Sequence, residues 1–176
     1  MIKNNILRTS IMCLMAIVIL SFRGDLAYRD VMSGQLKMLI PADFINVPKG
    51  GYKQHYAGEP TPDDFYCNKD TSEYVALIKL PMRLDDLGNA KQQIGQMALM
   101  DTSNKVHFND TTTINGNKIY LLDLDGTALD KRSAVKTFIV NTRNGGSLLG
   151  VISCDIALKK DWWPVAEQML RSIKLN

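Results

Sequence analysis

The sequence predicts an α+β fold in which a mostly antiparallel sheet of about six to seven strands is flanked by two helices. Three observations lead to this prediction. Four strand-like segments follow one another between residues 106 and 154, and an apolar stripe of helical period lies close to the C-terminus. The chain order is strands, one helix, four strands and a second helix, which is typical of a sandwich of helices on a sheet.

The four central segments are rich in Val, Ile, Leu, Thr, Phe and Tyr, which favours strands. Asn115–Asn117 and Asn144–Gly146 separate the outer pairs and supply residues that tolerate positive φ, as tight hairpins require. Residues 126–131 are predicted to form a looser middle connection. Because such short links join only antiparallel neighbours, a meander is expected from these segments: Val106–Ile114, Lys118–Leu124, Ala134–Asn141 and Ser147–Cys154.

The second helix has the clearest pattern of all the predicted elements. Asp161 is expected to be its N-cap, and Pro164 is expected in its first turn, where the missing N–H costs nothing. Six apolar residues recur at helical spacing and predict a stripe that lies on the sheet: Trp162, Val165, Ala166, Met169, Leu170 and Ile173.

The first helix is predicted after Tyr74–Leu80, a nearly continuous apolar run that indicates a central strand and is ended by Pro81. Asp85 and Asp86 stand where carboxylates cap amide groups. One face of the helix is expected to be apolar: Leu84, Leu87, Ile94, Met97 and Ala98.

Three shorter strands are expected in the first part of the domain. Leu36–Ile40 is apolar and is stopped by Pro41, Tyr52–Tyr56 alternates between apolar and polar residues, and Phe65–Cys67 forms a strand fragment.

The N-terminal residues 1–27 are predicted to be an export signal. Lys3 and Arg8 precede Ile11–Phe22, an apolar run shorter than the roughly 20 residues that span a membrane but within the about 7–15 of a signal-peptide core. If it is not cleaved, this segment would anchor the protein to the inner membrane. Residues 28–35 are predicted to be a polar linker, and residues 36–176 a single domain.

The charge of the domain argues against nucleic acid as a partner. Removing residues 1–27 takes away three basic side chains and one acidic side chain, which lowers the net charge from +3 to +1. A nearly neutral domain without a basic cluster lacks the electrostatic footprint that nucleic-acid binding requires.

Two cysteines, Cys67 and Cys154, remain after export, and both fall at predicted strand ends. An oxidising compartment would allow one disulfide between them. The alternative is two separate buried thiols, since free cysteines are commonly buried. The sequence leaves this choice open.

Short signatures at both ends of the domain resemble a known fold. The opening strand runs into Leu39–Phe44, and the chain closes with Met169–Leu175. Together with the order of elements, they resemble the PsbP-like fold, which includes the photosystem II extrinsic subunit, a nuclear Ran-binding protein and bacterial envelope proteins of the DcrB type. The resemblance covers residues 36–175. It implies a non-enzymatic binding or accessory role.

A second resemblance is local. The strand ending Asp123-Leu124-Asp125-Gly126-Thr127 is similar to the opening motif of the haloacid dehalogenase-like phosphatases. In that family the first Asp is the nucleophile and the second is the general acid/base, both near Mg²⁺, which would give these roles to Asp123 and Asp125. That fold needs parallel βαβ units after the motif, but only 49 residues follow Thr127. A Mg²⁺-dependent phosphohydrolase is therefore the alternative, and a strand that ends in a polar turn is the simpler interpretation.

No cofactor and no metal site are expected. His55 and His107 are the only histidines, and they form no ligand-spaced cluster with the cysteines. A nucleophilic serine turn and a phosphate-binding glycine loop are also missing from the sequence.

Two groups of residues are candidates for a binding surface. Trp163 lies about 100° from Trp162 around the helix, next to Lys160 at the edge of the apolar stripe. A tryptophan there either anchors a partner or covers the rim of the core. The second and weaker group, close to a Pro-rich acidic loop, consists of Tyr52, His55 and Tyr56.

These observations predict a non-enzymatic, exported protein of the bacterial cell envelope that binds a protein partner. An adaptor or immunity-type role in the periplasm, or on the outer face of the inner membrane, is the leading hypothesis. The alternatives are the phosphohydrolase and a purely structural envelope component. The sequence does not identify the partner.

Overall fold

The computed structural model describes residues 25–49, 51, 61–81, 83–84, 86–128 and 131–176. The predicted signal segment Ile11–Phe22, and the predicted strand and surface residues Tyr52, His55 and Tyr56, lie outside these residues. In chain order the elements are β1 (Leu26–Val31), β2 (Leu36–Pro41), β3 (Ile45–Asn46), β4 (Asp64–Cys67), β5 (Glu73–Leu80), α2 (Leu87–Met100), β6 (Lys105–Ile114), β7 (Asn117–Ala128), β8 (Lys131–Asn141), β9 (Ser147–Asp155), the 3₁₀-helix η2 (Ile156–Leu158), α3 (Lys159–Arg171) and β10 (Lys174–Leu175).

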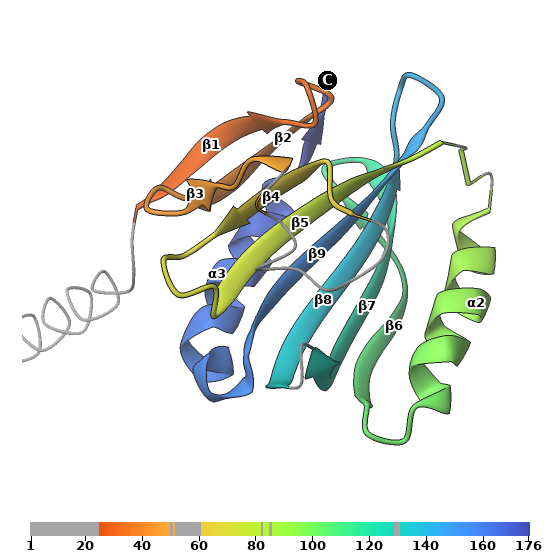
Figure 1. The fold of residues 1–176 in the computed structure, drawn as a ribbon. Helices are drawn as coiled ribbons and strands as arrows, with labels where there is room; N and C mark the ends of the chain where they lie inside the picture. Colours follow the sequence, from red (N-terminus) through yellow and green to blue (C-terminus); the bar gives the residue numbers. More distant parts are fainter. Residues whose placement is uncertain (1–24, 50, 52–60, 82, 85, 129–130) are drawn as a thin grey trace, which may run out of the picture.

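A seven-stranded antiparallel sheet forms the centre of the molecule, with the order β3-β4-β5-β9-β8-β7-β6 (Figure 1). The predicted meander is β6 to β9, and each of its strands pairs with the next in sequence. Strand β5 pairs with β9 along its whole length, from Glu73 opposite Cys154 to Leu80 opposite Ser147. The α+β fold class is confirmed, and the predicted central position of Tyr74–Leu80 corresponds to β5, which has strands on both sides.

The hairpin between β7 and β8 is longer and tighter than expected. Strand β7 continues through Gly126 and Thr127, which pair with Ser133 and Arg132. The looser connection predicted over residues 126–131 is therefore wrong. Gly126 suggested a turn, but in a strand it accommodates a close neighbour: an added Cβ would lie 2.4 Å from Oδ1 of Asn104.

A second, three-stranded sheet has the order β1-β2-β10. Strand β1 pairs with β2 from Leu26 opposite Pro41 to Val31 opposite Leu36, and β10 pairs with β2 on its other side. The prediction of a polar linker over residues 28–35 is wrong, because most of this segment is β1 and the turn after it. Tyr28 and Asp30 of β1 are exposed, whereas Arg29 is partly buried and donates hydrogen bonds to the carbonyls of Ala42 and Phe44. These three consecutive polar residues gave the segment the composition of a linker.

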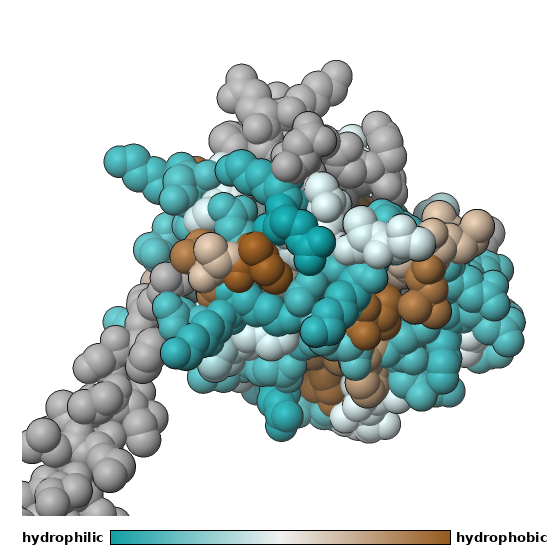
Figure 2. All heavy atoms as spheres, turned by 90° about the horizontal axis from the view of Figure 1, so that it is seen from below, coloured by the Kyte–Doolittle hydropathy of each residue, from teal (hydrophilic) through white to brown (hydrophobic). Residues whose placement is uncertain are grey.

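Helix α2 covers one face of the large sheet, next to β6 and β7 (Figure 1). Asp86 is its N-cap and accepts a hydrogen bond from the backbone N–H of Gly88. The close approach of α2 to β6 depends on Gly95 of the helix, where an added Cβ would lie 2.0 Å from Nδ2 of Asn109 on the strand. Met97 was predicted on the buried face, but it is 71% exposed. Figure 2 shows apolar side chains at the surface on this side of the molecule.

Helix α3 and the small sheet cover the opposite face (Figure 1). The whole predicted stripe from Trp162 to Ile173 is buried, as expected. The start of the helix differs from the prediction: α3 begins at Lys159, directly after η2, so Asp161 is in its first turn and is not the N-cap. Pro164 is the sixth helical residue, and the carbonyl of Lys160 therefore lacks an amide donor from it.

Cys67 and Cys154 are both free, buried thiols. Cys67 pairs with Tyr74, which pairs with Ser153, so Cys154 is one residue out of register with it. Because side chains alternate along a strand, the two cysteines point to opposite faces of the sheet. Cys67 packs with Phe65 and Ala76, whereas Cys154 belongs to the core beneath α3. The structure therefore contains two separate buried thiols, which was the alternative to a disulfide that the sequence left open.

The core beneath α3 depends on a glycine. Gly150 stands directly opposite Phe138, and an added Cβ would lie 2.1 Å from the Phe138 ring. Gly150→Ala is expected to lower the free energy of unfolding by about 1–3 kcal/mol, because the ring fills that space. Urea denaturation measures the loss. In the double variant Gly150→Ala/Phe138→Leu the loss should be smaller than the sum of the single losses, and strict additivity would contradict this account.

Candidate functional site

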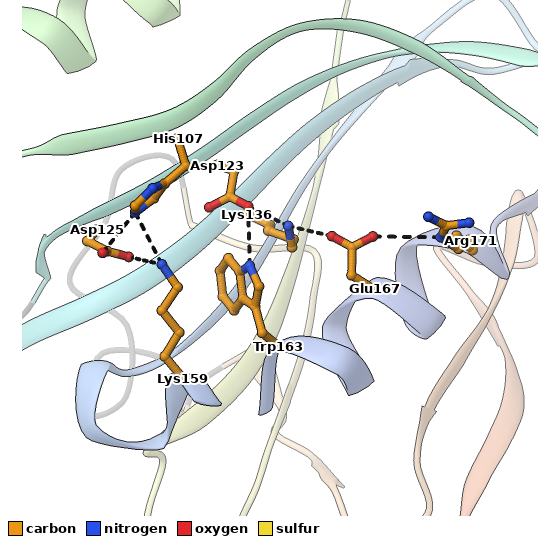
Figure 3. A network of polar contacts seen from close by, with 8 residues as sticks. All are labelled: His107, Asp123, Asp125, Lys136, Lys159, Trp163, Glu167 and Arg171. Atoms are coloured by element: carbon orange, nitrogen blue, oxygen red, sulfur yellow. Dashed lines mark hydrogen bonds and ion pairs between the residues drawn. The ribbon is translucent and has the colours of Figure 1, made fainter. Parts of the chain in front are cut away.

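A cluster of polar side chains lies between the large sheet and α3, on the face that is otherwise apolar (Figure 3). The alternation of strands places it there: Asp123 and Asp125 follow Ile119 and Leu121 on the same face of β7. Lys136 is directly opposite Asp123 on β8. The polar cluster consists of His107, Asp123, Asp125, Lys136, Lys159, Trp163, Glu167 and Arg171.

Lys136 is the centre of the cluster, with only 2% of its side chain exposed. Its Nζ lies 2.5 Å from Oδ2 of Asp123 and 2.7 Å from Oε1 of Glu167. It also lies 4.4 Å from the centroid of the Trp163 ring, within the range of a cation–π interaction. A buried ammonium group is costly unless it is paired, and here two carboxylates and an aromatic ring surround it.

Asp125, Lys159 and His107 form the second half of the cluster. Asp125 is bonded to the Lys159 ammonium through Oδ1 and lies 2.9 Å from Nε2 of His107 through Oδ2. Burial alone would raise the pKa of Asp125, but the hydrogen bonds from Lys159 and His107 outweigh it and hold that pKa below its usual value. The Asp125 carboxylate is therefore charged at neutral pH.

Trp163 joins the two halves (Figure 3). Its indole N–H donates to Oδ2 of Asp123 at 3.3 Å, and its ring lies beneath the ammonium groups of Lys136 and Lys159. The side chain is half-buried. Trp163 thus covers the rim of the core, as one of its two sequence interpretations expects, and it also reaches the surface. The anchoring of a partner stays a prediction.

A surface groove runs along the outer side of this cluster, with a volume of about 740 Å³. Its wall is mainly apolar, from Ile156, Trp163 and Pro164, and charged side chains border it. Lys160, predicted beside Trp163, is exposed at this groove. We call this the Trp163 groove, and its complete lining is Asp125, Ile156, Lys159, Lys160, Trp163, Pro164 and Glu167.

The phosphatase-like motif lacks the context that its chemistry requires. Asp123 and Asp125 lie inside β7, an antiparallel strand of a hairpin, and not at the end of a parallel strand that leads into a helix. Each carboxylate is paired with a lysine. Within the described residues no group of three or more His, Cys, Asp or Glu side chains is arranged to hold a metal ion.

Sequence reasoning missed the residue on which the cluster depends. Lys136 was not among the predicted site residues, because lysine is normally exposed in folded proteins. The sequence nevertheless contained a signal. Lys136 lies two residues after Ala134 and two before Phe138, so the alternation of a strand places its side chain on the same face as these two apolar residues. A charged residue at an inward position predicts a buried partner of opposite charge.

Comparison with known proteins defines the fold. The protein-family models give no match to this sequence. A search of the curated proteins gives none either. Among solved structures, the cyanobacterial PsbP protein CyanoP from Synechocystis sp. PCC 6803 is similar at a TM-score of 0.61 and 12% identity, over 89% of this chain and 95% of that chain. The fold is PsbP-like.

Two further structures have the same PsbP-like fold. LpqN of Mycobacterium tuberculosis, described as involved in cell envelope biogenesis, has a TM-score of 0.56 and 10% identity, over 86% of this chain and 91% of its own. The Ran-binding protein Mog1p of Saccharomyces cerevisiae has a TM-score of 0.55 and 13% identity, over 86% and 96%. The predicted resemblance to the PsbP-like fold is thus confirmed.

The pairing of Lys136 can be tested by mutation. Lys136→Met is expected to lower the free energy of unfolding by about 3–5 kcal/mol, because it leaves the buried Asp123 carboxylate without its cation. Lys136→Met/Asp123→Leu removes both charges and should recover most of that loss. Urea denaturation compares the two variants. A double variant as unstable as the single one would contradict the account.

The pKa of Asp125 predicts a dependence of stability on pH. Its pKa is lower in the folded than in the unfolded chain, so its stabilising contribution is complete above the unfolded value of about 3.9 and is lost as the pH falls through the folded value. Asp125→Asn should therefore lose less stability than the wild type between about pH 5 and the acid transition. Unfolding experiments at several pH values measure this difference, and parallel curves would contradict it.

Proposed function

We propose that this protein is an exported, non-enzymatic binding protein of the bacterial cell envelope, which docks a protein partner at the Trp163 groove. An accessory role as an adaptor or as an immunity-type protein fits this activity. The export signal predicted at residues 1–27 supports the location in the periplasm or on the outer face of the inner membrane. None of the helices in the described part of the chain combines the length and hydropathy needed to cross a bilayer.

The observation that carries the proposal is the fixed position of Trp163. Its indole donates to Asp123 and stacks beneath two ammonium groups, so its orientation is set before a partner arrives. Large aromatic side chains are enriched among residues that dominate binding energy, and an anchor that is already ordered loses little entropy on binding. The mainly apolar wall with a charged rim is the usual anatomy of a protein interface.

The ion pairing of the charged groups in the polar cluster favours a binding function over a catalytic one. The carboxylates of Asp123 and Asp125 are each held by a lysine ammonium, and the cation of Lys136 is shared with Glu167. Groups paired in this way serve to position Trp163 and to hold α3 on the sheet. A general acid or base would need to exchange protons with a substrate, and ion pairs of this kind oppose that.

The structural neighbours give supporting context. One is described as Ran-binding and another as involved in cell envelope biogenesis. Both descriptions concern those proteins, and the fold alone does not transfer a function. They are consistent with the use of this fold as a binding module, which is the role proposed for the present chain.

The test is a crosslinking experiment in the native envelope. A photo-crosslinking amino acid at exposed position Lys160 should trap one partner in stoichiometric amount. Lys160→Glu and Trp163→Ala should each abolish capture by affinity pull-down with a chemical crosslinker, because they reverse a rim charge and remove the anchor. Lys160 is exposed, so Lys160→Glu separates a loss of binding from a loss of folding.

The matched control is Lys118→Glu, which makes the same charge change at an exposed position outside the groove. Capture should survive it. The proposal would be wrong if the partner bound all three variants equally, or if no partner was captured by the wild type.

A further inference from the structure

The small sheet turns one face to the core and the other to its surroundings. Leu36, Met38 and Ile40 of β2 are fully buried in the core beneath α3, so the residues between them point the other way. We call the outward side the lysine face. The strand register places five residues on it: Tyr28, Asp30, Lys37, Leu39 and Lys174.

Two ammonium groups stand close together on the lysine face. Lys174 on β10 is directly opposite Lys37 on β2. Their Nζ atoms lie 4.9 Å and 5.8 Å from the centroid of the same Tyr28 ring, which is 48% exposed. Like charges directly opposite each other destabilise a sheet, so this pair has a cost that a bound anion would remove.

The chain itself does not neutralise the two lysines. Among the residues that the structure describes, no carboxylate lies within ion-pair distance of either ammonium group. Asp30 on β1 is opposite Lys37, and it is the only acidic residue that the register of these strands places on the lysine face. The face is therefore positive, and its counter-charge has to come from outside the described chain.

The connection that precedes β1 brings this face close to a membrane. The apolar run predicted as the N-terminal signal or anchor ends at Phe22, and β1 begins at Leu26. Four Cα–Cα steps span at most about 15 Å, so the start of β1 lies within that distance of the end of the run, however the domain is turned. Figure 1 shows β1 on the side of the molecule away from α2.

The pairing of β1 favours a chain that keeps its N-terminal segment. A cut after Ala27, the end of the predicted signal, would remove Leu26 and Ala27 from β1, where both are paired with β2. The backbone just before the strand is bonded too, because the carbonyl of Asp25 accepts from the N–H of Ala42 at 2.8 Å. A chain cut there would lose these contacts.

We propose that the lysine face lies on the anionic headgroups of a membrane in which residues 1–24 are anchored. Lys37 and Lys174 contact the phosphate groups, and Tyr28 lies at the headgroup level, where tyrosine is enriched. The short apolar run Ile11–Phe22 is sufficient as an anchor, because long basic side chains at its two ends can reach the headgroups.

This inference rests on the proposed location at the outer face of the inner membrane, but it does not involve the Trp163 groove. None of the residues of the lysine face lines that groove. The occupant of the lysine face is a lipid surface, whereas the proposed occupant of the groove is a protein.

The test is a paramagnetic NMR experiment on the full chain in lipid nanodiscs. The nanodiscs contain two parts of phosphatidylcholine to one part of phosphatidylglycerol, and some headgroups carry a nitroxide, which broadens the amide signals of nearby residues. The strongest broadening is expected at β1, Lys37 and Lys174. Weaker broadening is expected at α2, whose exposed Met97 and Met100 are the alternative lipid contact.

Lys37→Gln/Lys174→Gln should lower the ratio of docked to undocked molecules at least about tenfold, because both lysines lose their attraction to the anionic surface. Neither lysine has an ion pair within the described residues, so the variant keeps its fold. The matched control Lys105→Gln/Lys118→Gln removes two exposed lysines of β6 and β7 and should dock as the wild type does. Nanodiscs of phosphatidylcholine alone should abolish the preferred orientation.

Any of the following results would overturn the proposal. The broadening is strongest at α2, docking is unchanged in phosphatidylcholine alone, the two double variants dock equally, or the intact mass of the protein from native membranes shows a chain that begins at Asp25 or later. Partner capture at Lys160 is measured in the same variants. Lys37→Gln/Lys174→Gln should lose docking and keep that capture, whereas failure of the proposed function would remove capture and leave docking intact.

Discussion

The structure depends on the pairing of one buried ammonium group. Lys136 lies between the large sheet and α3, and it is bonded to Asp123 on β7 and to Glu167 on α3. Because an unpaired charge in that position would be strongly destabilising, the two ion pairs favour the observed register of the β7–β8 hairpin and the observed rotation of α3. The same contacts fix Trp163 at the surface. The contacts that specify the fold are therefore the same ones that orient the proposed docking residue Trp163.

The arrangement also explains why an aspartate motif that resembles a catalytic one occurs in this chain. Strand β7 needs two inward-facing acidic residues at a spacing of two, one for Lys136 and one for Lys159. Gly126 follows because Asn104 approaches the backbone there. Asp123, Asp125 and Gly126 thus each have a structural reason that involves no phosphate chemistry. A short motif identifies a function only when the surrounding fold supplies its context.

The sequence predicts the elements whose patterns are local, and misses those that depend on contacts between distant segments. The meander and the stripe from Trp162 to Ile173 follow from periodicity and turn residues. Strand β1 was missed because its pairing with β2 stabilises a segment of polar composition. Helix α3 begins before Asp161 because η2 leads directly into it. Lys136 was missed because nothing near it in sequence reveals its partner on α3.

The opposite orientation of Cys67 and Cys154 has a consequence for how the fold responds to oxidation. The sheet separates the two thiols, and burial raises the pKa of both, that of Cys154 to about 12. Thiols that are protonated and enclosed react slowly with disulfides and oxidants. Among the described residues, Cys67 and Cys154 are therefore expected to stay as separate thiols under reducing and oxidising conditions alike. The stability of this part of the fold thus does not depend on a disulfide between these two residues.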